Sequence, residues 1–271
     1  MTETQLHGWT PPKGVLGDLV RTARQRAADL ARRGVPRAES RRHPRGFGAA
    51  LRRSTVGVIA EIKRSSPSKG ALDLALDAPA RASLYEAGGA AALSVLTEPT
   101  RFSGCIADLA AVSGATGIPV LRKDFIVDAV QVDEAARAGA DAVLLIARAL
   151  DPALMRDLAA HAGALGLDVL AEVRDEAELD RALGVDGCVV GVNTRNLESL
   201  EIDPGVGERL LRLVPPDRVA VYESGIASAP DVARAAAWGA DAVLVGSVLS
   251  RAADGAAAVR ALCAVPRQPR G

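Results

Sequence analysis

The sequence predicts a protein of the α/β class that folds as a single (β/α)8 barrel, or TIM barrel, with an extra N-terminal helix. Its 271 residues are close to the roughly 250 that such barrels use. A sequence pattern typical of a strand followed by a helix recurs along the chain. The core is aliphatic, since hydrophobic residues make up 49% of the chain and aromatic residues only 3%. Near-continuous aliphatic runs are typical of parallel strands that helices cover on both faces.

An amphipathic helix precedes the first strand. Apolar residues recur at three- and four-residue spacing within 14–33. They are Leu16, Leu19, Val20, Ala23, Ala27 and Leu30. We expect this extra helix to lie outside the repeating units of one domain that spans 1–271. Residues 1–13 and 265–271 show no such pattern, and we expect flexible ends there.

Eight apolar runs are strand candidates, and a helix-length segment follows each of them. The first, third, fifth and seventh runs are 56–62, 119–123, 168–173 and 219–223. The other four follow a helix end and a glycine turn, and they end at Leu96, Ala147, Val192 and Ser247. Strand centres lie roughly 20 to 35 residues apart, which matches the βαβ unit. An open doubly wound sheet is the alternative fold, but no GxGxxG motif follows the first strand.

Two helix starts in this series are marked by the sequence. Asp151-Pro152 precedes one helical segment, and Ser228 with Pro230 precedes another. A polar capping residue followed by proline is a usual start of a helix. We therefore expect helices to begin at both places.

Composition and charge exclude several function classes. The 33 Lys and Arg residues balance 33 Asp and Glu residues, so nothing favours a general nucleic-acid binder. No apolar run approaches the roughly 20 residues of a membrane span, and the first residues lack the pattern of a secretory signal. Cys105, Cys188 and Cys263 are too scattered for a disulfide framework. We expect a cytoplasmic protein with no nucleic-acid and no membrane partner.

Two further features concern metals and local charge. His7, His43 and His161 lie far apart and at no strand end, so we expect no metal site. Residues 21–53 contain eleven arginines and two acidic residues. A solvated helix face followed by a basic loop is the simpler interpretation. A positive field beside a site for anionic substrates is the alternative.

Chemically useful side chains collect at the strand ends, where barrel enzymes carry their active sites. They are Glu61 and Lys63 on strand one, Arg122, Lys123 and Asp124 on strand three, Glu172 on strand five, Asn193, Thr194 and Arg195 after strand six, Glu223, Ser224 and Gly225 after strand seven, and Gly246 and Ser247 after strand eight. Any one of them has a structural explanation as a solvated or ion-paired strand end. Their coincidence at six of eight strands predicts a catalytic mouth.

Two glycine-containing turns indicate a phosphate site. Ser224 and Gly225 follow strand seven, and Gly246 and Ser247 follow strand eight. The loops after these two strands are the usual phosphate-binding place in such barrels. Glycine lets backbone N–H groups approach phosphate oxygens. Tight turns are the structural alternative, and the pairing of the two loops favours phosphate.

Taken together, these motifs resemble the indole-3-glycerol phosphate synthase family over nearly the whole chain. The most specific segments are IAEIKRSSPSKG (59–70), LSVLTEPTRFSG (93–104), IPVLRKDFIVD (118–128), AEV (171–173), GVNTRNLESLEID (191–203), ESGI (223–226) and VGS (245–247). The resemblance implies a carboxy-lyase of tryptophan biosynthesis. Such an enzyme converts 1-(2-carboxyphenylamino)-1-deoxyribulose 5-phosphate, a phosphorylated anthranilate-derived molecule, into indole-3-glycerol phosphate, carbon dioxide and water. It further implies that no cofactor is used, and we expect a monomer or a weak homo-oligomer.

Roles for individual residues are also implied by the resemblance. Lys123 matches the general acid of ring closure, Glu172 the acid/base glutamate of the later steps, and Lys63 the second catalytic lysine. Which lysine serves dehydration stays open. Glu61 and Glu223 match carboxylates of the lysine network.

Further residues match contacts to the substrate. Asn193, which we count in the catalytic set, and Arg195 match polar contacts, while Ser66 and Pro67 match the loop that holds the anthranilate carboxylate. The walls around the aromatic ring would be Phe102, Phe125, Leu144, Ile146 and Leu197. Core packing explains the leucines and the isoleucine equally well. The phosphate site would consist of Ser224, Gly225, Gly246 and Ser247.

Two alternatives stay open. One is a paralogue that is inactive or devoted to a specialised metabolite, although both lysines and both key glutamates are present. The other is a different phosphate-binding barrel such as phosphoribosylanthranilate isomerase, which commonly has a cysteine on strand one where this chain has Glu61 and Lys63. The chain departs from the family pattern at Tyr222, where a small residue is expected, within 102–117, and in its arginine-rich segment 31–48.

Overall fold

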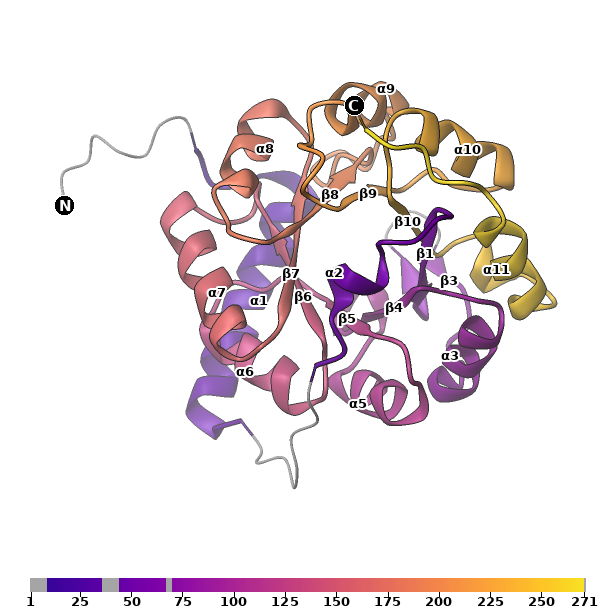
Figure 1. The fold of residues 1–271 in the computed structure, drawn as a ribbon. Coiled ribbons are helices and arrows are strands. Elements are labelled where there is room, and N and C mark those ends of the chain that lie inside the picture. Colours follow the sequence, from indigo (N-terminus) through magenta and orange to yellow (C-terminus); the bar gives the residue numbers. More distant parts are fainter. Residues whose placement is uncertain (1–8, 36–43, 67–69, 271) are drawn as a thin grey trace.

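The computed structural model describes residues 9–35, 44–66 and 70–270. It shows a closed barrel of eight parallel strands, which confirms the predicted fold class (Figure 1). The barrel strands are β1 Gly57–Ile62, β4 Ala92–Leu96, β5 Val120–Lys123, β6 Ala142–Ile146, β7 Asp168–Val173, β8 Val189–Asn193, β9 Ala220–Glu223 and β10 Ala242–Val245. Neighbours in the chain pair in parallel, and β10 closes the barrel against β1 with Gly57 opposite Ala242.

Helices cover the outside of the barrel between successive strands and after β10. They are α3 Ala78–Ala87, α5 Ile106–Ala115, α6 Ala129–Arg137, α7 Pro152–Ala164, α8 Glu176–Leu183, α9 Pro204–Leu211, α10 Ala229–Ala237 and α11 Gly255–Cys263. Asp151 caps α7 by accepting from the N–H groups of Ala153 and Leu154, as the Asp-Pro signal predicted. Helix α10 also begins where expected, but the Ser228 side chain does not cap it.

Within the described residues, two helices precede the repeating units. Helix α1 Gly14–Arg33 is the predicted extra helix, and it buries its apolar stripe against the barrel layer beside α6. Helix α2 Phe47–Ala50 was not expected. It closes the amino-terminal end of the barrel, which faces the viewer in Figure 1. Phe47 is fully buried there, and the Gly48 N–H donates to Asp168 at 2.8 Å.

Four short elements complete the described structure. They are the antiparallel strands β2 Ser65–Ser66 and β3 Gly70–Ala71, helix α4 Pro99–Phe102 and the 3₁₀ helix η2 Leu249–Arg251. None is long enough to show a hydrophobic period. Both β2 and α4 follow barrel strands at their carboxyl ends, so they border the mouth of the barrel.

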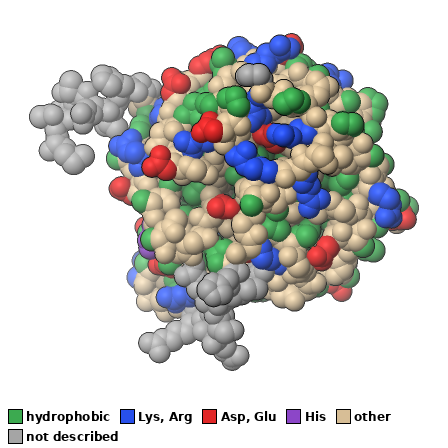
Figure 2. Space-filling view, in the orientation of Figure 1, with side chains coloured by type: hydrophobic (Ala, Val, Ile, Leu, Met, Phe, Trp, Pro, Cys, Tyr) green, Lys and Arg blue, Asp and Glu red, His purple; other side chains and the backbone are tan. Residues whose placement is uncertain are grey.

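Several residues of the arginine-rich stretch form structural ion pairs. Arg26 binds the buried carboxylate of Asp124 through two nitrogens, at 2.7 and 3.2 Å. Arg45 binds Asp141, which precedes β6 at the amino-terminal end of the barrel, at 2.8 Å. Figure 2 shows basic and acidic side chains interspersed on that end. Arg45 therefore does not contribute to a positive field at the mouth, which lies at the other end.

Both ends of the described chain make specific contacts where we expected flexibility. Arg267 and Arg270 bind Asp241 at 2.7 and 2.8 Å. The indole N–H of Trp9 donates to the carbonyl of Arg148 at 3.2 Å. Residues 1–8 and 271 of the two terminal segments lie outside the described residues.

Candidate active site

A pocket of about 310 Å³ opens at the carboxyl ends of the barrel strands. It brings together every described residue of the site that the sequence predicted. These are Glu61, Lys63, Ser66, Phe102, Lys123, Phe125, Leu144, Ile146, Glu172, Asn193, Arg195, Leu197, Glu223, Ser224, Gly225, Gly246 and Ser247. Pro67 lies outside the described residues. The pocket has the position that barrel enzymes use for catalysis.

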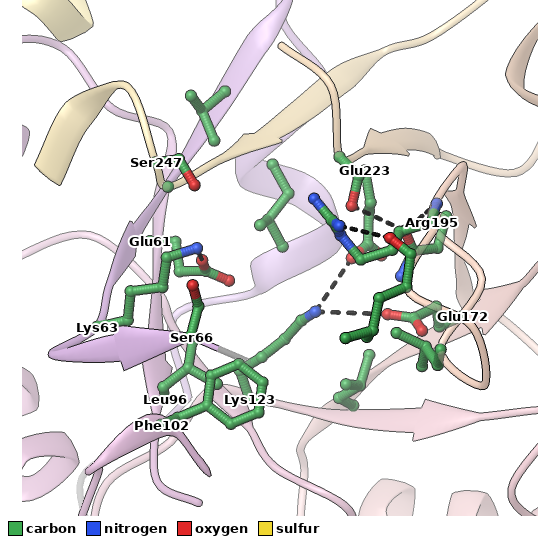
Figure 3. Close-up of a pocket in the computed structure, with 18 of the residues that line it drawn as sticks. Glu61, Lys63, Ser66, Leu96, Phe102, Lys123, Glu172, Arg195, Glu223 and Ser247 are labelled. Atoms are coloured by element: carbon green, nitrogen blue, oxygen red, sulfur yellow. Dashed lines mark hydrogen bonds and ion pairs between the residues drawn. The ribbon is translucent and has the colours of Figure 1, made fainter. Parts of the chain in front are cut away.

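Lys123, at the end of β5, lies between two carboxylates (Figure 3). Its Nζ is 3.4 Å from Oε2 of Glu172 on β7 and 3.2 Å from Oε2 of Glu223 on β9. Burial by itself would lower the pKa of Lys123. The charges of Glu223, Glu172 and Glu61 outweigh burial and raise the pKa of Lys123 above its ordinary value. Lys123 is therefore a cation that carries a proton at neutral pH.

Lys63 and Glu61 form a second ion pair, on the opposite side of the pocket in Figure 3. The Lys63 Nζ lies 2.6 Å from Oε1 of Glu61. Burial by itself would raise the pKa of Glu61, but Lys63 and Lys123 hold the pKa of Glu61 below its usual value. Glu61 is therefore ionised. Glu61 therefore acts electrostatically on both lysines, although it contacts only Lys63. Lys123 contacts Glu172 and Glu223.

Glu223 is the carboxylate for which ionisation is least favourable. Its side chain is buried, with 1% of the residue exposed. Burial raises the pKa of Glu223 to about 8, and Glu172 adds to the rise while Lys123 opposes it. Its Oε1 has no hydrogen-bond partner among the described residues. Burial thus opposes ionisation of Glu223, whereas its contact with the cationic Lys123 favours it.

The raised pKa predicts that the stability of Glu223→Gln relative to wild type increases as the pH rises. A carboxyl group with a pKa of 4.5 when unfolded and about 8 when folded binds more protons in the folded state. Its contribution to stability is full below pH 4.5 and is lost as the pH rises through 8. Glutamine keeps the neutral shape and avoids this loss.

Thermal unfolding of both proteins at about pH 5 and pH 8.5 measures this effect. The gain in the unfolding midpoint should be larger at the higher pH, at about 2 to 4 °C for each kcal/mol. An equal gain at the two pH values would contradict the raised pKa of Glu223.

An apolar wall faces the charged groups. Phe102 and Phe125 pack with their ring centroids 6.4 Å apart. Leu144 and Ile146, on β6, are buried and also line the pocket, so they serve both the core and the wall. Leu19 of α1 reaches the same pocket. Leu19 belongs to the apolar stripe predicted from the sequence, but such a stripe does not indicate which surface the helix packs against.

Polar groups of the loop after β8 are held in fixed positions. Oδ1 of Asn193 accepts from the Ser224 hydroxyl at 2.9 Å and from the Arg195 N–H at 3.0 Å. The Arg195 guanidinium donates to the Leu200 carbonyl at 2.8 Å. Burial lowers the pKa of Arg195, while Glu61 opposes the change. The hydroxyl of Ser66, across the pocket, has no partner among the described residues.

The turns after β9 and β10 face the pocket with backbone groups. Ser224 and Gly225 have left-handed φ angles of 70° and 86°. Within the described part of the chain, the N–H groups of Gly225, Gly246 and Ser247 donate no hydrogen bond to the protein. Free N–H groups in adjacent turns form a suitable cradle for an anion.

Tyr222 points away from the pocket, because strand alternation turns it outward when Glu223 turns inward. Its ring packs on Trp238 with centroids 5.9 Å apart. It also lies against Gly207, where an added Cβ would be 2.3 Å from a ring carbon. The tyrosine fills the space between β9 and two outer helices, so this departure from the family pattern does not narrow the pocket.

The described residues contain neither a candidate metal site nor a candidate membrane span. No group of three or more His, Cys, Asp or Glu residues among them has an arrangement that could hold a metal ion. In the same residues, every helix is too short or too polar to cross a membrane.

Acid–base side chains that converge from several strands on one pocket at this end of the barrel define a class of protein. The chain is a (β/α)8-barrel enzyme. Over residues 18–262 it matches the family model described as Indole-3-glycerol phosphate synthase. The chain belongs to this family, as the motifs predicted, and members of the family are carboxy-lyases.

Named relatives agree with this assignment. Indole-3-glycerol phosphate synthase 1 of Streptomyces coelicolor is 49% identical over 221 residues, which are 82% of this chain and 82% of the relative. The synthase of Nocardioides sp. is 51% identical over 82% of this chain and 85% of its own. That of Exiguobacterium sibiricum is 41% identical over 92% and 96%. The 3-hexulose-6-phosphate synthase structure from Salmonella typhimurium shares the fold, with a TM-score of 0.61 at 17% identity over 77% of this chain and 97% of that one.

Proposed function

We propose that this protein catalyses the closure, decarboxylation and dehydration of 1-(2-carboxyphenylamino)-1-deoxyribulose 5-phosphate to indole-3-glycerol phosphate. The observation that carries the proposal is Lys123, a protonated lysine between Glu172 and Glu223 in a pocket with an aromatic wall. The substrate needs each of these features. Its ring fits the apolar wall, its ketone needs a proton donor, and its phosphate needs an anion cradle.

In the first step a ring carbon attacks the ketone carbon, and the ketone oxygen becomes an alkoxide. We assign proton donation to Lys123. Its neighbouring carboxylates stabilise the protonated lysine, so Lys123 keeps its proton until a stronger base forms in the pocket. The developing alkoxide is such a base, and donation in the transition state lowers the barrier. Glu61 and Glu223 hold the positions and charges of the lysines.

The later steps release carbon dioxide and water. Loss of carbon dioxide restores the aromatic ring. The hydroxyl then leaves as water with a proton from a lysine, Lys63 or Lys123, while a base accepts the proton released as the indole double bond forms. We assign the base to Glu172, which contacts Lys123 and lies at the same pocket.

The remaining groups would bind the substrate. Ser66, whose buried hydroxyl lacks a partner among the described residues, would donate to the anthranilate carboxylate together with the loop at Pro67. Asn193 and Arg195 would make polar contacts to the sugar-derived chain. The backbone of Ser224, Gly225, Gly246 and Ser247 would hold the phosphate.

An assay of the purified protein with the carboxyphenylamino substrate, followed by indole fluorescence, tests the proposed function. We expect turnover without an added cofactor. Absence of turnover by folded protein would favour the inactive paralogue. The same protein should not isomerise phosphoribosylanthranilate, and turnover in that second assay instead would favour the alternative barrel enzyme.

Phosphate binding predicts the effect of a charge placed in the cradle. Ser247→Asp should weaken inhibition by inorganic phosphate about tenfold or more, because a like charge a few ångströms away in a partly buried site costs over ~1.4 kcal/mol. Ser83→Asp, on the exposed face of α3, is the matched control and should change little. The two inhibition constants are measured in the same buffer. Equal constants for both variants would contradict the phosphate site.

We also propose that the protein acts in the cytoplasm as a monomer or a weak homo-oligomer. Its three cysteines are all free, which suits a reducing compartment. The acid–base groups of the pocket all lie at strand ends of one closed barrel. Light scattering at assay concentrations measures the oligomeric state.

A further inference from the structure

Gly191 lies beside the buried carboxylate of Glu223. It belongs to β8, next to the strand that carries Glu223. A Cβ added at Gly191 would be 2.2 Å from Oε1 of Glu223 and 3.3 Å from its Cδ. The backbone of Gly191 does not have a positive φ. The local conformation therefore accepts any residue, and the close approach of the carboxylate is what requires glycine.

The close contact with Gly191 sets the position of the Glu223 carboxyl group. In the register of β8 and β9, Asn193 lies opposite Glu223, and Gly191 is two residues earlier on the same face. The carboxyl group extends back over Gly191, with Oε1 against the glycine and Oε2 3.2 Å from Lys123 Nζ. The missing side chain thus creates the space in which the carboxyl group contacts Lys123 from inside the barrel wall.

The same arrangement occurs independently at the other lysine. Gly246 follows β10, the strand that pairs with β1. A Cβ at Gly246 would be 2.3 Å from Oε1 of Glu61 and 2.8 Å from Nζ of Lys63. Each of these two carboxylates therefore lies over a glycine that belongs to the neighbouring strand or directly follows it. Gly246 was expected only as part of the phosphate turn, and this contact is an additional constraint on it.

We propose that Gly191 is a positioning residue for proton transfer, because its lack of a side chain sets the place of the Glu223 carboxyl group beside Lys123. The kinetic consequence rests on the proposed function, whereas the placement itself does not. Gly191 does not line the pocket, so it would act only through Glu223.

Alanine at this position separates placement from folding. The added methyl group meets the far end of a flexible glutamate and, at 3.2 Å, one methyl group of Leu170. No backbone atom is among its three nearest neighbours. We therefore expect Gly191→Ala to fold and to displace the carboxyl group of Glu223 from Lys123.

The experiment compares Gly191→Ala, Glu223→Asp and the double variant with wild type. Gly191→Ala should lower kcat about tenfold or more with KM changed less than threefold, as expected for a group that acts in the transition state. Aspartate is one methylene shorter, so it relieves the collision. The double variant should be more active than Gly191→Ala, although Glu223→Asp alone is less active than wild type. Gly163→Ala on α7, where nothing lies within 4 Å of an added Cβ, is the matched control.

A crystal structure of Gly191→Ala shows the position of the Glu223 carboxyl group without an activity assay. A Glu223 carboxyl group in its wild-type position, or wild-type kcat, would overturn the inference. An inactive wild type would instead refute the proposed function and leave the crystallographic test in force. If Gly191→Ala does not fold, Gly191→Ala is combined with Glu223→Ala, which removes the carboxyl group that the added methyl group would meet. That double variant should unfold at the same temperature as Glu223→Ala, and a lower midpoint would overturn the inference.

Discussion

Lys123→Ala is expected to block ring closure and to lower kcat at least 10³-fold, toward the upper end of the roughly 10² to 10⁴ that a general acid contributes. The variant loses the proton donor. It also leaves the buried carboxyl groups of Glu172 and Glu223 without their shared cation. Substrate should remain bound and unchanged, because the donor is needed only once the alkoxide forms.

Lys63→Ala should behave differently. Lys63 contacts only Glu61 among the acidic residues described, so its removal leaves the partners of Lys123 intact. We expect weaker substrate binding or accumulation of a ring-closed intermediate. Loss of a group used only in the transition state lowers kcat, whereas loss of uniform binding raises KM.

Rapid-quench single turnover on both variants, with separate detection of carbon dioxide loss and water loss, measures the two block points. Lys13→Ala is the control, since Lys13 is exposed and does not line the pocket. Identical block points together with identical KM changes would show that the proposed division of labour is wrong. The synthase function itself would survive that result.

The barrel could be predicted from the sequence because each unit repeats one pattern. Aliphatic runs such as 142–146 and 189–193 are continuous because both faces of each strand are covered. Helix α2 has only four residues, too few for a hydrophobic period. Its position under the barrel depends on a contact with Asp168, 120 residues further along the chain.

The candidate site, like the fold, was only partly predictable from the sequence. Its members could be named from motifs at the strand ends, but their pairing could not. Lys123 meets Glu172 and Glu223, which are 49 and 100 residues away, only because the closed barrel turns three strand ends inward. The outward direction of Tyr222 was available from alternation with Glu223. The burial that raises the pKa of Glu223 was not, since the carboxyl group lies inside the barrel against Gly191 of the neighbouring strand.

Glu172→Gln is expected to lower kcat by about 10²-fold or more while KM stays within severalfold. The amide oxygen keeps the size of the side chain and still accepts from Lys123, now 3.4 Å from Oε2. The amide does not exchange a proton at neutral pH, so the step that needs a base fails. Glu176→Gln, an exposed glutamate four residues further on, is the matched control and should leave kcat unchanged.

The Glu172→Gln variant should stop the reaction at dehydration and not at ring closure. The charge of Glu172 is one of those that raise the pKa of Lys123. Its removal makes Lys123 a stronger acid, and ring closure should therefore proceed at least as fast as in wild type. The loss then falls on dehydration, and the decarboxylated molecule that still carries its hydroxyl should accumulate in single-turnover samples. Wild-type turnover with chemistry rate-limiting would remove Glu172 from the mechanism, and accumulation of unreacted substrate would move it to the first step beside Lys123.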